Sequence, residues 1–223
     1  MGFQGVILDV DGTLVLSNDA HAQAWVDAFA KYDYQINFEE VRQMIGIGGD
    51  QIIPKFAPGL SDAEGKGKEI ITYRTQLIVD KFAPKVSPAS GARELVEKMQ
   101  NEGLHLIIAS SAKAEELGVL LKAAQVDDLL NQDEATTSSD AKNSKPAPDI
   151  VEVALSKLNL QPENVVMLGD TPYDVESANK AGVEVIAFRC GGFDDSLLEN
   201  AIAIYDHPAD LLQNYDNSPL SKV

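Results

Sequence analysis

The chain has 223 residues, of which 44% are hydrophobic and 24% charged, a composition typical of a globular protein with a substantial core. Acidic residues outnumber basic ones by 35 to 18, so the formal net charge is −17. This charge argues against nucleic acid or an anionic membrane as a partner, because both would be repelled. It also means that an anionic substrate would depend on local cations and a metal ion.

The cysteine content and the N-terminal residues bear on location. The single cysteine, Cys190, cannot form an internal disulfide, and the N-terminal residues lack the basic region and apolar core of a signal peptide. No apolar run approaches the length that spans a bilayer. We therefore expect a reducing, cytoplasmic location. Cys190 is expected to close a strand, since no His or Asn context in the sequence suggests a nucleophile.

Apolar runs alternate with amphipathic helical stretches along most of the chain. This alternation predicts an α/β fold with a Rossmann-like, doubly wound parallel sheet. The expected strands are Gly5 to Val10, Leu104 to Ser110, Val165 to Gly169, Glu184 to Phe188 and Ala201 to Tyr205, with a weaker one between Leu130 and Thr136. Helices are expected at Ser90 to Asn101 and Pro148 to Leu158, and Gly103 and Gly182 are expected to end helices before strands.

Residues 16–87 break this alternation, because they contain helical patterns with no clear strand between them. The expected helices are Ala20 to Tyr32, Phe38 to Met44 and Ala63 to Lys81. Pro84 and Pro88 stiffen the connection that follows. We expect an α-helical cap domain over residues 16–87, inserted into a core domain of residues 1–15 and 88–223. Such an insert would exclude water and select the substrate.

Two aspartates follow the first expected strand. The run Val6–Leu8 is typical of a strand buried on both faces, which places Asp9 and Asp11 at its carboxyl end with their side chains on the same side. Ligands bind at the carboxyl ends of strands in open α/β sheets. The alternative is that Asp11 and Gly12 merely form a turn.

The next clearly predicted strand, Leu104 to Ser110, ends in a residue with a hydroxyl side chain, and Ser111 follows it. A hydroxyl and the N–H groups at the start of the following helix are donors for a phosphate oxygen. A serine in this place also serves as a helix N-cap, and the two roles are compatible.

Lys145 is followed by two prolines, Pro146 and Pro148, which fix the backbone before a helix begins. In an acidic chain this cation would neutralise a phosphoryl group and keep a nucleophilic carboxylate ionised. The alternative is a solvated loop lysine.

A third buried-type strand ends at Gly169 and is followed by Asp170 and Asp174. Carboxylates at a strand end are the hard oxygen ligands that Mg²⁺ prefers. Asp9, Asp170 and a backbone carbonyl would make such a set. The alternative is that Asp170 or Thr171 caps the next helix and Asp174 favours its first turn.

These segments resemble the motifs of a known superfamily. In chain order they are Asp9-x-Asp11-Gly12-Thr13, Ser110, Lys145 and Gly169-Asp170-x-x-x-Asp174. Their order and their places on the expected elements resemble the haloacid dehalogenase-like (HAD) hydrolases over essentially the whole chain. The position of the insert is similar to that in the helical-cap subclass, which includes phosphoglycolate phosphatases and β-phosphoglucomutases. Asp11 argues against the dehalogenase branch, which lacks a carboxylate there.

The resemblance implies a role for each motif residue. Asp9 would attack phosphorus and form an aspartyl-phosphate, while Asp11 would be the general acid and base and would ligate Mg²⁺ through its carbonyl. Asp9 and Asp170 would supply the carboxylate ligands of Mg²⁺. Phosphoryl oxygens would be bound by Ser110, Ser111 and Lys145. Asp174 would orient the water molecules of the metal ion or the side chain of Lys145.

The insert carries candidates for substrate contact. His21 and Trp25 lie on one helix face and resemble cap-helix residues, although a helix that packs its Trp explains them equally well. The glycines of residues 46–49, including Gly48 and Gly49, resemble the cap's specificity loop, or they form a turn. Arg74 is a candidate for reaching the substrate phosphate, or an exposed helix arginine.

Three functions remain open at this point. We expect a phosphatase for a small phosphorylated metabolite such as phosphoglycolate or a sugar phosphate, from a monomer or homodimer. A β-phosphoglucomutase-type mutase is the first alternative, but Gly169 stands where the mutase motif has Glu, and the cap loop has glycines where the mutase has an arginine for a second phosphate. A non-catalytic protein that binds a metabolite is the second alternative.

Overall fold

Five parallel strands form the sheet of the computed structural model, which describes residues 2–221. They are β1 (Gly5–Leu8), β2 (His105–Ile108), β3 (Val165–Gly169), β4 (Glu184–Phe188) and β5 (Ala203–Tyr205). Their order is β2-β1-β3-β4-β5, so the chain winds to one side of β1 and then to the other. The predicted Rossmann-like sheet is confirmed. Its switch point lies between β1 and β3, where ligands bind in such folds.

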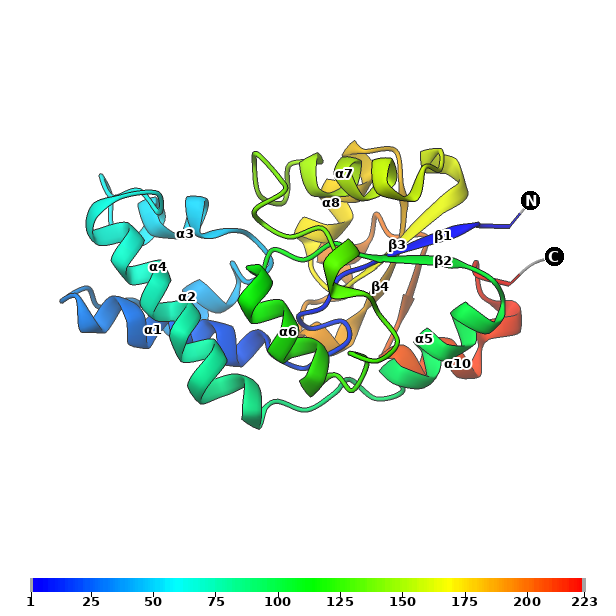
Figure 1. Ribbon diagram of the computed structural model, residues 1–223, viewed down its shortest axis with the longest axis horizontal. Helices are drawn as coiled ribbons and strands as arrows, with labels where there is room; N and C mark the ends of the chain where they lie inside the picture. The colour runs from blue at the N-terminus through cyan, green and yellow to red at the C-terminus, as the bar shows by residue number, and fades with distance from the viewer. Residues whose placement is uncertain (1, 222–223) are drawn as a thin grey trace.

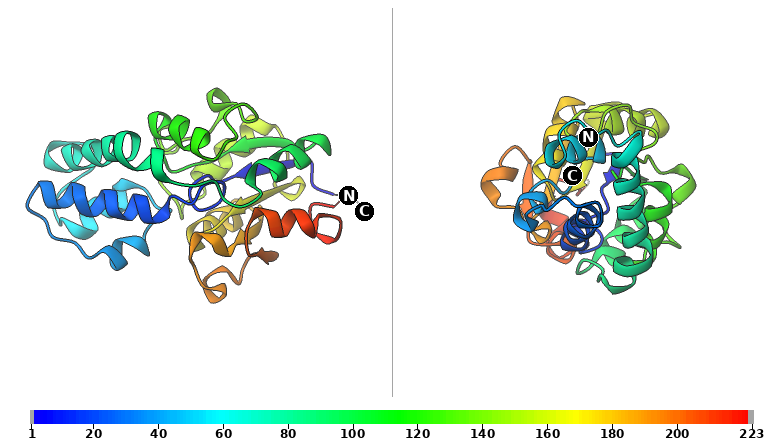
Figure 2. Two further views of the ribbon diagram at one scale, coloured as in Figure 1. Left: turned by 90° about the horizontal axis from the view of Figure 1, so that it is seen from below. Right: turned by 90° about the vertical axis from the view of Figure 1, so that its left-hand side faces the viewer.

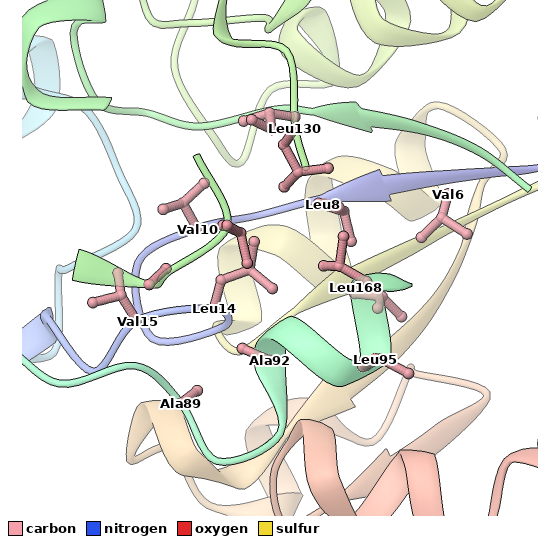
Figure 3. Close-up of a cluster of buried hydrophobic side chains, with 14 of the residues drawn as sticks. Val6, Leu8, Val10, Leu14, Val15, Ala89, Ala92, Leu95, Leu130 and Leu168 are labelled. Atoms are coloured by element: carbon pink, nitrogen blue, oxygen red, sulfur yellow. The ribbon is translucent and has the colours of Figure 1, made fainter. Parts of the chain in front are cut away.

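Helices cover both faces of the sheet (Figure 1). One face carries α5 (Ala92–Asn101), α6 (Ala114–Ala123) and α10 (Pro208–Gln213), and the other carries α7 (Asp149–Leu158), α8 (Pro172–Lys180) and α9 (Asp195–Leu198). Successive β1 side chains alternate between the two cores: Leu8 packs on the first face and Ile7 on the second. In Figure 3, Leu8 and Leu168 lie with Leu95 in the first core.

The inserted segment forms a separate group of helices. They are α1 (Asn18–Lys31), α2 (Phe38–Arg42), α3 (Gly49–Phe56) and α4 (Gly65–Leu77), and α4 runs on into the π-helical turn η1 (Ile78–Phe82) and the 3-10 turn η2 (Ala83–Lys85). Their buried apolar side chains, among them Trp25, Phe29 and Ile53, form a cluster of their own. Figures 1 and 2 show this group beyond the end of the sheet to which the strands run.

Some predicted elements differ from the structure. The prediction of a strand between Leu130 and Thr136 is wrong, because the segment contains the 3-10 turn η3 (Gln132–Glu134). Within this segment only Thr136 forms a β-bridge, and its partner is Ala109. Helix α3 was not predicted, because glycines precede it and Pro54 lies inside it. Packing of its apolar residues in the insert's core outweighs those weak propensities.

The C-terminal segment is more buried than its polar sequence indicates. The polar sequence of residues 212–223, which includes Pro219, predicts a segment that frays or lies along the surface, yet Tyr215 and Leu220 pack into the core beside α5. Residues 222 and 223 lie outside the described part of the chain. Among residues 2–221, no helix has the length and apolar character needed to cross a membrane.

Candidate active site

Asp9 lies directly beyond β1, at the switch point of the sheet. Its N–H donates to the carbonyl of Leu168 at 2.9 Å, which extends the ladder, and its side chain is buried. The chain then turns sharply through Gly12, which has φ +80°. A Cβ at this position would lie 2.1 Å from Oδ2 of Asp170. Glycine is therefore required there both for the turn and for the approach of Asp170.

Lys145 is buried at the centre of the site. Its Nζ donates to Oδ1 of Asp9 at 2.7 Å, to Oδ1 of Asp174 at 2.7 Å and to the carbonyl of Ala109 at 3.2 Å. Burial acts to lower the pKa of Lys145, but Asp174 and Asp9 outweigh it and hold the pKa above its ordinary value. The ammonium therefore stays charged, and the alternative of a solvated loop lysine is wrong.

Asp174 joins this centre to helix α8. Its Oδ2 accepts hydrogen bonds from the N–H of Thr171 at 3.0 Å and from the Thr171 hydroxyl at 2.6 Å. The Thr171 hydroxyl accepts from the N–H of Asp174 in return, which completes a capping box. Asp174 thus caps the helix with one oxygen and binds Lys145 with the other.

Three buried carboxylates meet at the switch point. Asp9, Asp170 and Asp174 each offer an oxygen within 4.8 Å of the other two. Lys145 pairs with Asp9 and Asp174, whereas Asp170 accepts only from neutral groups among the described residues. With all three carboxylates ionised, the cluster would carry three negative charges against one positive charge.

This charge excess fits a divalent cation. Burial and the neighbouring carboxylates raise the pKa of Asp9 to about 8, because Lys145 offsets only part of their effect. They also raise the pKa of Asp170 well above its usual range, against the opposing hydrogen bonds from Asn18 and Thr13. A divalent cation would restore the charge balance, and buried oxygen ligands of this kind suit Mg²⁺. The predicted part of Asp11 in metal binding, through its carbonyl, stays a prediction.

The raised pKa values predict how pH affects metal-free protein. A carboxyl with a higher pKa in the folded state binds its proton more tightly there. Folding therefore loses stability as pH rises from 3.8, the ordinary pKa of an aspartate, to about 8, the pKa of Asp9 in the folded protein. We expect the melting temperature in EDTA to fall between pH 5 and pH 8, and saturating Mg²⁺ to flatten that slope. Scanning calorimetry with and without Mg²⁺ measures both. A metal-free melting temperature that rises over this range would contradict the prediction.

Asp11 lies apart from the acid cluster and contacts the insert. Its Oδ1 accepts from the Ser17 hydroxyl and from Nε2 of His21, at 2.5 Å in the second case. Arg74 contacts the other ring nitrogen of His21, and because arginine only donates, Nδ1 accepts and Nε2 carries the hydrogen. Burial acts to raise the pKa of Asp11, but His21 and Ser17 outweigh it, and the pKa lies below its usual value.

Arg74 also binds the core domain. It donates to Oε2 of Glu116 at 2.5 Å, while the Thr75 hydroxyl donates to Oε1 at 2.6 Å, and the arginine lies 5.3 Å from the Trp25 ring centroid. Glu116 is buried and belongs to α6, so these contacts join the insert to the core. The alternative of an exposed helix arginine is wrong.

Removal of the Glu116 charge should weaken this junction. We expect Glu116→Gln to lower the free energy of unfolding by about 1.5–3 kcal/mol, because the hydrogen bonds to a buried charged group are lost or weakened. Urea denaturation measures the change. Glu115→Gln, at the neighbouring exposed position, is the matched control and should change stability by less than about 0.5 kcal/mol. Equal effects of the two substitutions would contradict a role for the junction.

A cavity of about 310 Å³ opens over Asp9 and Asp11. Its lining includes most of the predicted substrate and phosphate residues, namely His21, Gly48, Gly49, Arg74, Ser111 and Lys145. The Ser111 hydroxyl donates to the carbonyl of Gly46 at 2.9 Å. Ser110 does not line the cavity; it is fully buried, and its hydroxyl accepts from the N–H of Ala112 at 3.1 Å. This contact lies in the turn before α6, whose N-cap is Lys113, so the alternative that Ser110 caps the helix is wrong.

Several residues of the site carry no signal in the sequence. Asn18 donates to Asp170, which lies more than 150 residues away along the chain. Lys113 and Lys142 line the cavity and have no ion pair among the described residues. A buried glutamate such as Glu116 looks like an ordinary first-turn acid in the sequence. Only the tertiary arrangement identifies these residues.

The fold and the acid cluster define an α/β enzyme with its reactive groups at the switch point. Residues 6–188 match the model of the haloacid dehalogenase-like hydrolase family. The chain therefore belongs to this family of hydrolases. The resemblance inferred from the motifs is confirmed.

Individual relatives are more distant. The chain is 30% identical over 188 residues to SUPPRESSOR OF QUENCHING 1 from Arabidopsis thaliana, named as a chloroplastic protein, and the match covers 82% of this chain but 18% of that protein. It is 24% identical to pyrophosphatase PpaX from Bacillus thuringiensis, covering 84% and 83% of the two chains. A hydrolase from Pseudomonas syringae has a similar structure, with a TM-score of 0.85, 25% identity and coverage of 96% and 98%.

Proposed function

We propose that the protein is a Mg²⁺-dependent phosphatase that hydrolyses a small phosphorylated metabolite through an aspartyl-phosphate on Asp9. The observation that carries the proposal is the place of the Asp9 carboxylate. It is buried beside the Lys145 ammonium and two further carboxylates, and it lines a cavity large enough for a small metabolite. A carboxylate in this setting is held still and shielded from water, as a nucleophile requires.

In the first step, an oxygen of Asp9 attacks phosphorus and displaces the alkoxide of the substrate. Asp11 donates a proton to that leaving oxygen. Lys145 binds a phosphoryl oxygen as the charge moves, and Ser111 binds another. The predicted phosphoryl contact of Ser110 would require its buried hydroxyl to turn toward the cavity. For Ser111 this role requires its hydroxyl to leave the carbonyl of Gly46.

In the second step, Asp11 accepts a proton from water, and the water oxygen attacks the phosphorus of the aspartyl-phosphate. The bond between phosphorus and Asp9 breaks, which releases phosphate and restores the carboxylate. His21 supports both steps, because its Nε2–H donates to the ionised Asp11 that accepts this proton. In the same arrangement Arg74 keeps the histidine in that tautomer.

Mg²⁺ would be held by Asp9, Asp170 and the carbonyl of Asp11. Asp174 would not bind the ion directly but would orient its water molecules or Lys145. The ion would neutralise phosphoryl charge during transfer. Lys145 alone cannot balance three carboxylates and an incoming phosphate, which supports a requirement for the cation.

The helices of residues 16–87 would act as the cap of this site. The support is their separate hydrophobic cluster and their polar contacts to the core, through His21, Arg74 and Gly46. A cap of this kind would exclude water during phosphoryl transfer and shape the substrate pocket.

A phosphomutase is the second candidate, and one observation favours it. A mutase needs a second anion site, and Lys113 and Lys142 line the cavity without an ion pair to any of residues 2–221. These lysines would bind a second anionic group in the cavity, although the cap loop offers Gly48 and Gly49 rather than a cation.

The products of turnover distinguish these candidates. We would incubate the protein and Mg²⁺ with phosphoglycolate, sugar phosphates, β-glucose 1-phosphate and, because of the PpaX relatives, pyrophosphate. Release of inorganic phosphate supports the phosphatase. Conversion of β-glucose 1-phosphate to glucose 6-phosphate without free phosphate would favour the mutase, and no turnover of any compound would favour a non-catalytic binding protein.

A further inference from the structure

The side chain of Asn18 bridges two distant parts of the core. It is 4% exposed at the start of α1, and its Nδ2 donates to Oδ2 of Asp170 at 2.8 Å and to the carbonyl of Gly191 at 3.0 Å. No described backbone N–H of α1 binds this side chain, so it does not cap its own helix. Its contacts are made entirely with the edge of the acid cluster.

The two acceptors fix the orientation of the Asn18 amide. A flipped amide would place its oxygen against the Asp170 carboxylate and the Gly191 carbonyl, which would repel it. In the observed orientation Oδ1 is buried and has no hydrogen-bond partner among the described residues. A buried amide oxygen without a partner costs about 1–3 kcal/mol, so a donor is expected there.

Glycine backbone encloses this amide and its carboxylate. A Cβ at Gly12 would lie 2.4 Å from Nδ2 of Asn18, and a Cβ at Gly191 would lie 1.8 Å from Oδ2 of Asp170. The amide and the carboxylate are thus held together with little room for other arrangements. Oδ1 is bonded to the same carbon as Nδ2, the atom that donates to Asp170.

We infer that Asn18 is a positioning residue for the divalent cation and uses both ends of its amide. Nδ2 holds the Asp170 carboxylate in one orientation, and Oδ1 accepts a hydrogen bond from a water molecule in the hydration shell of the cation. Mg²⁺ keeps several waters when proteins bind it, and these waters need acceptors. The inference rests on the metal site of the proposed function, but it concerns affinity for the ion rather than turnover.

The affinity of the protein for Mg²⁺ tests this role. Residues that hold a metal ligand in place contribute roughly 10–100-fold to metal affinity. We expect Asn18→Ala and Asn18→Leu to raise the Mg²⁺ dissociation constant by about that factor, as measured by calorimetry on metal-free protein. Leucine has approximately the shape of asparagine but no hydrogen-bonding groups. The test can therefore be made with either variant if the other one fails to fold.

Asn37→Ala is the matched control. Asn37 is an exposed asparagine at the start of α2, where it accepts from the N–H of Glu40. Its loss should lower the melting temperature and leave the Mg²⁺ dissociation constant unchanged. A folded Asn18 variant that binds Mg²⁺ within twofold of wild type would overturn the inference while the proposed function stands. If wild type binds Mg²⁺ but hydrolyses no phosphate ester, weaker binding by the Asn18 variants still supports the inference, and the proposed function fails alone.

Discussion

Asp9→Asn should reduce the rate of phosphate release by about 10⁴-fold or more, since removal of a catalytic nucleophile leaves only binding and charge stabilisation. Asparagine has nearly the same shape as aspartate, and Lys145 keeps its bond to Asp174. The variant should therefore fold, and it should bind the substrate. Steady-state kinetics with the best substrate from the metabolite panel measure the loss.

Asp50→Asn is the control for this experiment. Asp50 lines the same cavity from the insert, but it is exposed and lies outside the acid cluster. The same chemical change there should alter the turnover number by no more than a few-fold. An Asp9→Asn variant with more than about one tenth of wild-type turnover would contradict Asp9 as the nucleophile.

Lys145→Met should destabilise the metal-free protein by about 3–5 kcal/mol at pH 8, because it leaves buried carboxylates without their counter-ion. The loss should be smaller at pH 5, where Asp9 binds a proton in place of the missing ammonium, since the pKa of Asp9 is raised to about 8 even with the lysine present. Urea denaturation in EDTA at the two pH values measures the difference. The variant should also lose most of its turnover, since no other ammonium binds Asp9 in the described residues.

Lys142→Met separates this effect from the loss of any lysine near the cavity. Lys142 lines the same cavity three residues earlier, yet it is exposed and has no ion pair among the described residues. We expect a stability change below about 0.5 kcal/mol. A loss of less than about 1 kcal/mol in Lys145→Met at pH 8 would show that the ammonium does not stabilise the acid cluster.

The reactive centre was predictable because each of its acids follows a strand. Asp9 and Asp170 lie far apart in the chain, but β1 and β3 are neighbours in the sheet and end at the same edge. The apolar runs before the two acids predict the strands, and a parallel sheet brings their ends together. The same argument places Lys145 near the site only loosely, since its loop and its burial are tertiary features.

The contacts between the insert and the core were not predictable in the same way. Asn18, Arg74 and Glu116 lie on helices, where the sequence pattern indicates which face is buried but not which distant residue it meets. Arg74 was a candidate for the substrate phosphate, and in the structure it binds Glu116 and His21 while lining the cavity. Helix packing angles and loop paths decide such contacts, and neither is encoded in hydrophobic periodicity.

Predictions from the local helix and strand propensities of the residues were wrong where tertiary packing outweighed those propensities. Helix α3 forms despite Pro54 because Ile52 and Ile53 are buried in the core of the insert. Conversely, the apolar residues before Thr136 do not form a strand, because Leu130 packs into the core and the chain meets the sheet at one residue. Burial of apolar side chains, rather than propensity, decides both segments.

Trapping of the covalent intermediate tests the central claim most directly. Wild-type protein and Mg²⁺ would be mixed with excess substrate, quenched in acid during turnover and digested for mass spectrometry. We predict a phosphoryl group on the peptide that contains Asp9, removed by hydroxylamine and absent from the Asp9→Asn variant. Continued turnover with no phosphoryl group on Asp9, or with the group on another residue, would contradict the account.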